Sequence, residues 1–197
     1  MARQLWLLRH AEAEPHGTRP DAQRRLTERG EQQARAAGVA IGRLAVAFDL
    51  VLYSPKVRAR ATAELAGEGW SQSQRDLFTE HEPLAGGFDA SQAVDALAGV
   101  PAQDGRLLLV GHEPDLSSTV AGLTGGRIDL KKGGLAVVRS DGSPAHPGGE
   151  LALLLRPREL SLIAGVIGGV GGGAGVGGAG AVRTGGVRAG GVPINRH

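Results

Sequence analysis

The chain contains no cysteine among its 197 residues, and only 3% of its residues are aromatic. The absence of cysteine excludes a disulfide framework, a thiol nucleophile and a zinc site built on thiolates. The scarcity of aromatic side chains argues against a surface that stacks nucleic-acid bases. The apolar stretch between Gln4 and Arg9 has only four residues, too few for the core of a secretion signal, so we expect a cytoplasmic protein.

The formal net charge of +2 comes from the C-terminal end of the chain. The last 33 residues carry three arginines and no acidic residue, whereas the remainder has 19 basic and 20 acidic side chains. A nearly neutral body lacks the basic surface that nucleic acids require, so we expect no nucleic-acid partner. We also expect no metal and no other cofactor, because no pair of histidines stands with a carboxylate at metal-ligand spacing.

Glycine content divides the chain into two parts. Residues 165–197 hold 14 glycines in 33 positions, mixed mainly with alanine and valine, and such a segment buries little side-chain surface. We predict a folded domain over residues 1–164 and a disordered, glycine-rich tail over residues 165–197. As an alternative, the uncharged stretch at 160–182 is long enough to span a bilayer, but its glycines supply little transfer energy, so membrane anchoring is not favoured.

Short apolar runs alternate with helical patterns over the predicted domain. The patterns predict strands at residues 4–8, 50–53, 106–110, 134–139 and 150–155, and helices at 27–44, 54–66, 90–97, 115–123 and 157–164. Thr27 is predicted to cap the first helix, and Ser54 and Pro55 to begin the second. The alternation favours a three-layer α/β/α domain with a mostly parallel mixed sheet. The last two strands form a predicted hairpin, which places at least one antiparallel strand at an edge.

Arginine and histidine follow three of the predicted strands. Arg9 and His10 follow the first strand, Arg58 comes soon after the second, and His112 follows the strand at 106–110. Because the carboxyl ends of parallel strands meet at one edge of a sheet, we expect these side chains to converge where open α/β folds bind ligands. Guanidinium groups bind phosphate, and an imidazole can be a covalent nucleophile. The sequence therefore predicts phosphoryl transfer through a phosphohistidine.

The segments around these residues resemble the histidine phosphatase superfamily, and within it the small SixA-like phosphohistidine phosphatases. The matching motifs, in the family's order, are residues 8–11 (LRHA), 25–30 (RLTERG), 54–62 (SPKVRARAT), 109–114 (LVGHEP) and 130–135 (LKKGGL). The resemblance covers about residues 1–164 and implies a phosphoglycerate mutase-like fold. It also implies a phosphatase that hydrolyses protein phosphohistidine in two steps, so a phosphohistidine-bearing protein is the expected partner. For the oligomeric state, a monomer is the default expectation.

The resemblance implies a role for each of the four residues that follow the strands. His10 would be the nucleophile that carries the phosphoryl group. Arg9 and Arg58 would hold the phosphoryl oxygens, and His112 would stabilise the charge on them. These four residues are the predicted catalytic set.

Three further residues stand near the motifs. Arg24 is a candidate phosphate contact, because it lies just before the predicted start of the first helix. Ala11 stands where the family usually has glycine, and its methyl group is tolerable only with a negative backbone φ. Asp21 is interpreted as a charge in a turn or on a helix face.

The identity of the leaving group stays open at this stage. Larger members of the superfamily use a carboxylate to protonate an alcohol leaving group. Glu80, Glu82 and Asp89 lie in the matching region, but none of them fits the pattern of that acid. Imidazole leaves more easily than an alkoxide, so the missing acid favours a phosphohistidine substrate. The alternatives are a small-molecule phosphomonoesterase that uses Glu82 or Glu80, and a non-catalytic phosphate-binding module.

Overall fold

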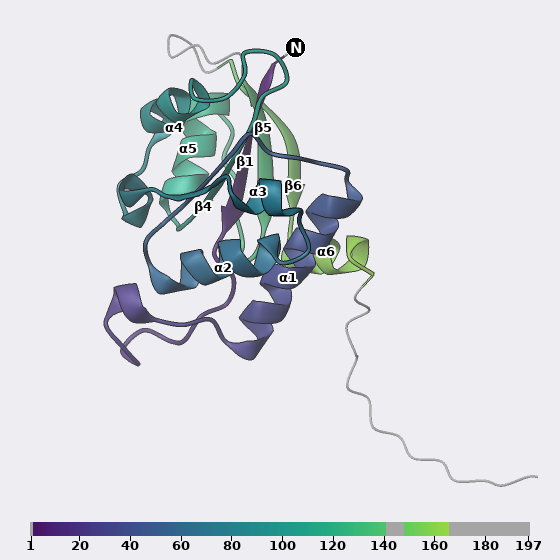
Figure 1. The fold of residues 1–197 in the computed structure, drawn as a ribbon. Helices are drawn as coiled ribbons and strands as arrows, with labels where there is room; N and C mark the ends of the chain where they lie inside the picture. The colour runs from purple at the N-terminus through teal and green to yellow at the C-terminus, as the bar shows by residue number, and fades with distance from the viewer. Residues whose placement is uncertain (1, 141–147, 166–197) are drawn as a thin grey trace, which may run out of the picture.

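A six-stranded mixed sheet runs through the molecule in the strand order β3-β2-β4-β1-β5-β6 (Figure 1). The computed structural model describes residues 2–140 and 148–165. The strands are β1 (Arg3–Arg9), β2 (Leu50–Tyr53), β3 (Phe78–Glu80), β4 (Arg106–Gly111), β5 (Leu135–Ser140) and β6 (Glu150–Leu155). The first four are parallel to one another, and β5 pairs antiparallel with both β1 and β6. The predicted hairpin is present, but its antiparallel strand β5 lies inside the sheet and β6 forms the edge.

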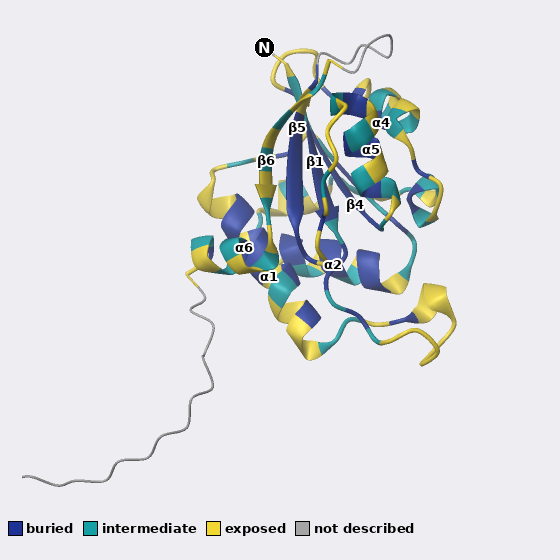
Figure 2. Cartoon of the chain, turned by 180° about the vertical axis from the view of Figure 1, so that it is seen from behind, coloured by how far each residue is buried: buried dark blue, intermediate teal, exposed yellow. Residues whose placement is uncertain are grey.

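Helices cover both faces of this sheet, which confirms the predicted three-layer arrangement (Figure 1, Figure 2). One layer contains α1 (Glu28–Arg43), α2 (Val57–Gly67) and α6 (Pro157–Ile163), and the other contains α4 (Ala90–Leu97) and α5 (Asp115–Thr124). The short helices α3 (Gln72–Arg75), η1 (Asp21–Gln23) and η2 (Glu82–Ala85) lie in the connections. Within the described ranges, no helix combines the length and the apolar character needed to cross a membrane.

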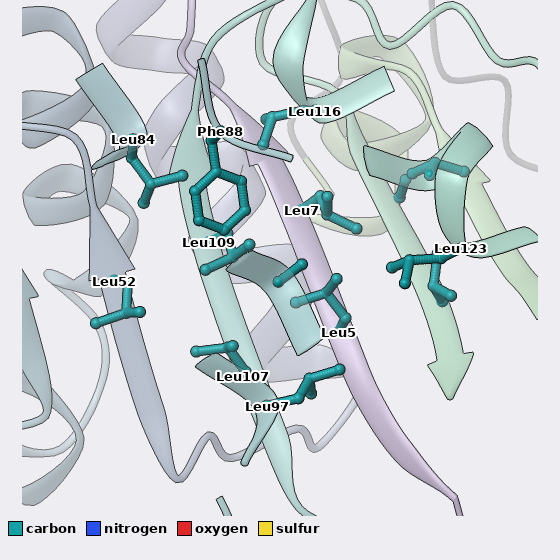
Figure 3. Close-up of a cluster of buried hydrophobic side chains, with 14 of the residues drawn as sticks. Leu5, Leu7, Leu52, Leu84, Phe88, Leu97, Leu107, Leu109, Leu116 and Leu123 are labelled. Carbon is teal, nitrogen blue, oxygen red and sulfur yellow. The ribbon is translucent and has the colours of Figure 1, made fainter. Parts of the chain in front are cut away.

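Side chains alternate along the strands and so build two cores, one on each face of the sheet. On β1, Leu5 and Leu7 join the cluster under α4 and α5, whereas Trp6 and Leu8 join the cluster under α1 and α2. Figure 3 shows the first cluster, in which leucines from β1, β2 and β4 surround Phe88. All four β1 side chains are buried. An unbroken apolar run is typical of such a strand, which is covered on both faces.

Helix α2, strand β3 and helix α3 differ from the sequence prediction. The helix predicted to begin at Ser54 begins at Val57, with Lys56 in the N-cap position. The Ser54 hydroxyl does not cap this helix, because it lies 2.8 Å from a ring nitrogen of His112. Strand β3 and the one-turn helix α3 were not predicted, because each is too short to show a hydrophobic period.

The predicted end of the domain at residue 164 follows the last helix closely. Helix α6 ends at Ile163, and its Leu160 is fully buried against the cluster under α1 and α2. Apart from Gly165, the predicted tail at 165–197 lies outside the described residues, as does most of the uncharged stretch at 160–182. The division into domain and tail stays a prediction.

Two glycines allow α1 to approach its neighbours closely. A Cβ at Gly30 would lie 1.9 Å from the carbonyl oxygen of Glu12, and a Cβ at Gly38 would lie 1.9 Å from that of Ala66 on α2. The first approach packs the start of α1 against the chain that follows β1, and the second packs α1 against α2. The relative positions of α1, α2 and β1 therefore depend on these two backbone contacts.

The second contact gives a stability prediction. We expect Gly38→Ala to lower the free energy of unfolding by about 1–3 kcal/mol, because the added methyl group overpacks a rigid backbone contact. Gly42→Ala on the same helix is the matched control, since nothing lies within 4 Å of a Cβ built there. The control is expected to leave stability unchanged or raise it by up to about 1 kcal/mol through helix propensity. Urea unfolding measures the free energy of unfolding of both variants. Equal values for Gly38→Ala and Gly42→Ala would show that the packing of α1 on α2 does not need this glycine.

Candidate active site

The carboxyl ends of β1, β4 and β2 lie next to one another at one edge of the sheet, as parallel pairing requires. Arg9 ends β1, His112 follows β4, and Arg58 lies in the first turn of α2, directly after β2. Together with His10 and Arg24, these residues line a cavity of about 420 Å³. The fold thus brings together all five residues that the sequence named as phosphate or catalytic contacts.

Hydrogen bonds hold both ring nitrogens of His10. Its Nδ1 lies 2.8 Å from the carbonyl oxygen of Ala11, and its Nε2 lies 3.2 Å from Nε of Arg58. A carbonyl only accepts and a guanidinium only donates, so Nδ1 carries the proton and Nε2 carries the lone pair. Burial lowers the pKa of His10 to about 2, and the nearby Arg58 and Arg9 cations act in the same direction. His10 is therefore a neutral imidazole whose lone pair faces a guanidinium.

His112 is a second buried imidazole, with its ring centroid 5.0 Å from that of His10. Its Nε2 lies 2.8 Å from Ser54 Oγ, and its Nδ1 is buried and has no hydrogen-bond partner among the residues that the structure describes. The backbone amide of Lys56 donates to the same Ser54 oxygen, and one arrangement that satisfies both contacts turns the hydroxyl proton toward His112 Nε2. Burial lowers the pKa of His112 to about 3, and Arg58 and Lys56 add to the effect. In this arrangement neutral His112 carries its own proton on Nδ1.

Arg9 also has an N–H group without a partner. Its Nη1 donates to the carbonyl oxygen of Leu130 over 2.8 Å, whereas its Nε is buried and unpaired. A buried donor without a partner costs about 1–3 kcal/mol, so two such donors at one cavity are costly for the protein alone. A phosphoryl oxygen would accept from both Arg9 Nε and His112 Nδ1, and the residues present therefore suit an oxyanion.

Arg24 and Arg58 share a carboxylate from η1. Asp21, which the sequence analysis interprets only as a charge in a turn or on a helix face, lines the cavity and accepts hydrogen bonds from both arginines and from Lys56. Arg24 is buried, with Nε and Nη2 on Asp21 and Nη1 on the carbonyl oxygen of Glu14. Arg24 thus reaches the predicted place, but each of its guanidinium nitrogens already has a protein partner.

The carboxylates that the sequence analysis names as possible proton donors are not among the residues that line this cavity. Glu80 pairs with Arg60 on α2, and Asp89 caps α4 by accepting from the Gln92 amide. Glu82 lies in the first turn of η2. In the part of the chain that the structure describes, no group of three or more His, Asp or Glu side chains is arranged to hold a metal ion.

Glu113 and Asp115 line the cavity instead, and the sequence analysis did not consider either as a site residue. Burial raises the pKa of Glu113, although Ser117 Oγ donates to its carboxylate over 2.9 Å and Arg9 is nearby. The Asp115 carboxylate accepts from the backbone amides of residues 87 and 88. The position of Glu113 directly after His112 in the LVGHEP motif is the sequence feature that could have identified it.

Two motif residues act on the backbone of the site. Thr62 Oγ1 donates to the carbonyl oxygen of Arg58 over 2.6 Å and accepts from the Ala11 amide over 3.1 Å, which ties α2 to the chain after His10. Gly133, at a φ of 71°, donates its N–H to the carbonyl oxygen of His10. Ala11 is not among the described residues with positive φ, so its methyl group is accommodated.

Comparisons with known proteins agree with this geometry. Residues 5–82 match the model of the histidine phosphatase superfamily (branch 1). An uncharacterized protein of Picosynechococcus sp. is 32% identical over 165 residues, which cover 80% of this chain and 98% of that protein. A structure described as the putative phosphohistidine phosphatase SixA from Nakamurella multipartitia has a TM-score of 0.64 and 28% identity, covering 80% of this chain and 97% of that one. The structure of the protein histidine phosphatase SixA complexed with tungstate has a TM-score of 0.67 and 24% identity. The match covers 80% of this chain and 99% of that one. The chain belongs to the histidine phosphatase superfamily and has the fold of its SixA-like members, as its motifs predict.

Proposed function

We propose that this phosphatase acts on protein phosphohistidine and carries the phosphoryl group on His10 before water removes it. The observation that carries the proposal is the hydrogen bond from Arg58 Nε to His10 Nε2, 3.2 Å long, in a cavity lined by further cations. An unprotonated nitrogen is needed for attack on phosphorus, and a hydrogen bond donated to Nε2 requires that Nε2 carries a lone pair. Membership of the superfamily supports the phosphatase activity, and the likeness to the putative phosphohistidine phosphatase supports the substrate class.

In the first step, the Arg58 Nε–H group passes from His10 Nε2 to a phosphoryl oxygen, the freed lone pair of Nε2 attacks phosphorus, and the P–N bond of the substrate breaks. The electron pair of that bond passes to the substrate's ring nitrogen, which leaves as neutral imidazole because the other ring nitrogen carries a proton. Phosphoryl transfer depends mainly on positioning and on charge stabilisation. Arg58, Arg9 Nε and His112 Nδ1 supply the donors for the phosphoryl oxygens. The Ala11 carbonyl accepts from His10 Nδ1 and stabilises the positive charge that forms on the attacking ring.

In the second step, water attacks the phosphorus of phospho-His10. The bond between phosphorus and Nε2 breaks, its electron pair returns to Nε2, and the oxygen and both protons of the water leave with inorganic phosphate. The same donors stabilise this transition state, since the phosphoryl oxygens do not need to change partners. His10 returns to the neutral form in which it began.

Two observations support an imidazole leaving group over an alcohol. Glu80 and Glu82, the acids that the ester alternative would use, do not line the cavity. The connection from β3 to α4, residues 81–89, holds a single 3-10 turn, so this side of the cavity has no inserted domain and suits a protein surface. The cytoplasmic location and the monomeric state stay predictions.

A phosphomonoesterase is the second candidate, and Glu113 is the observation that favours it. Its carboxyl lines the cavity, and burial raises its pKa, so it holds a proton to higher pH than an ordinary glutamate. An alcohol leaving group needs such a donor, whereas imidazole needs it less. Glu113 therefore replaces Glu80 and Glu82 as the residue that decides between the two substrate classes.

The nucleophile is tested by phosphate release from a phosphohistidine-bearing protein. We expect His10→Ala to lower the rate by about 10⁴-fold or more, the order of loss when a covalent nucleophile is removed. His81→Ala is the matched control, because His81 does not line the cavity, and it should change the rate by less than about twofold. Release that survives His10→Ala would refute the nucleophile. A wild-type chain that binds phosphate but releases none from phosphohistidine or from an ester would favour the binding module.

The leaving group is tested with Glu113→Gln, which keeps the shape of the side chain and removes its ionisable proton. We expect hydrolysis of phosphohistidine to stay within about threefold of wild type, and hydrolysis of phosphoserine to fall about 10²-fold, the usual contribution of a general acid. Glu82→Gln is the control and should affect neither substrate. A tenfold or larger loss on phosphohistidine would contradict our view that its imidazole leaves without this carboxyl.

The protonation state is tested by NMR titration of the histidine rings. Because the pKa values of His10 and His112 are lowered to about 2 and about 3, their ring signals should not move between pH 8 and pH 5. Histidines in the unfolded chain titrate near pH 6.5, so below that pH the unfolded state binds more protons than the folded state. The free energy of unfolding should accordingly fall as the pH drops below about 6.5. A midpoint near pH 6.5 for either ring, each identified by its alanine variant, would contradict the assignment of neutral rings.

A further inference from the structure

Asp21 is an anion in a cavity that we propose to bind an anion. Its carboxylate accepts from Arg24 Nη2 at 2.8 Å, Lys56 Nζ at 3.2 Å and Arg58 Nη2 at 3.2 Å. Burial alone would raise the pKa of Asp21, but these hydrogen bonds outweigh burial and hold the pKa well below its usual range. A carboxylate that stays ionised is no proton donor, and its charge repels a phosphoryl dianion. Asp21 therefore needs a role other than acid catalysis or phosphate binding.

The contacts of Arg58 indicate that role. Its Nη1 donates to the backbone carbonyl of Asp21 at 2.6 Å, and its Nη2 donates to the Asp21 carboxylate. Its Nε donates to His10 Nε2. Because a guanidinium is planar and rigid, two contacts to one residue fix the plane of the group and with it the direction of Nε. The guanidinium has more N–H groups than these contacts use, so others stay available for phosphoryl oxygens.

Asp21 is itself held from two sides, which makes it a suitable anchor. Arg24 contacts its carboxylate through Nε and Nη2, and Lys56 contacts it from the residue before α2. Asp21 therefore connects η1 to the start of α2, the element that carries Arg58. A free arginine side chain has many rotamers, and ordering it against His10 needs partners that do not move.

We propose that Asp21 is a positioning residue, which holds the Arg58 guanidinium in register with His10 Nε2 at a cost in affinity for the phosphoryl group. This inference rests on the proposed function, since it concerns the same two residues. It implies two opposite effects of removing the charge. The cavity gains one net positive charge and binds an oxyanion more tightly, while the guanidinium loses its fixed direction and the chemical step slows.

The test is Asp21→Asn, assayed with a phosphohistidine-bearing protein and with tungstate as a competitive inhibitor. We expect kcat to fall about 10–100-fold, in line with the cost of a misplaced catalytic group. The inhibition constant for tungstate should fall about threefold to tenfold, because one repulsive charge is gone. Asp21→Glu keeps the charge. Its inhibition constant for tungstate should therefore equal that of the wild type, and its kcat should lie between those of Asp21→Asn and the wild type. The ¹⁵N shift of His10 Nε2 should move toward the value of an unbonded ring nitrogen in Asp21→Asn.

The matched control is Glu14→Gln on the same connection. The Glu14 side chain pairs with Arg19 and accepts from the Arg25 amide, but it does not line the cavity, so kcat and the tungstate constant should stay within about twofold of wild type. If kcat falls in Asp21→Asn while the inhibition constant for tungstate is unchanged or larger, Asp21 has a merely structural role. An unchanged kcat would also overturn the inference. A wild-type chain without phosphatase activity would overturn the proposed function and this inference together, whereas an active wild type with an unaffected Asp21→Asn would overturn this inference alone.

Discussion

A hydrogen bond from Nε of Arg58 to Nε2 of His10 joins the part of the site that follows β1 to the part that lies on α2. The two residues belong to different elements, so their contact depends on how α2 is placed against β1. The Thr62 hydroxyl sets this placement from inside α2, because it bridges the Arg58 carbonyl and the amide of the residue after His10. Gly38 sets it from outside, by letting α1 approach α2 at backbone distance. The direction of a lone pair thus follows from helix packing, and an error of about 1 Å there would reach the chemistry directly.

Burial determines both the charge and the unmet hydrogen bonds of the site. His10 and His112 are 5% and 6% exposed, and their burial keeps both rings neutral among several cations. The same burial leaves Arg9 Nε and His112 Nδ1 without partners. Each unpaired donor lowers the stability of the fold, and the two buried hydrophobic cores offset this cost. An oxyanion that accepted hydrogen bonds from these two groups would remove that cost, which is a physical argument for the phosphate site that we propose.

The sequence predicted the meeting of Arg9, His10 and His112 because each follows a strand, and parallel pairing brings strand ends to one edge. The sequence could not predict the role of Asp21 at the cavity, because η1 lies in a connection that has no hydrophobic period. The Ser54 prediction failed for a different reason. A serine before a proline is a sound local signal for a helix start, but a tertiary contact with His112 takes the hydroxyl away. Local patterns therefore located the strand ends, and contacts between distant segments completed the site.

The charges around the cavity explain why an anion such as Asp21 belongs in it. Five cationic side chains line the cavity (Arg9, Arg24, Lys56, Arg58 and Lys132), and three carboxylates line it with them (Asp21, Glu113 and Asp115). With all three carboxylates ionised, the excess among these groups is two positive charges, which matches in magnitude the charge of a phosphoryl dianion. Without Asp21, three cations would face one another across a partly buried space, and their repulsion would oppose folding. The Asp21 carboxylate neutralises part of the charge of these cations. The positive charge that remains would be balanced by the dianionic phosphoryl group of the substrate.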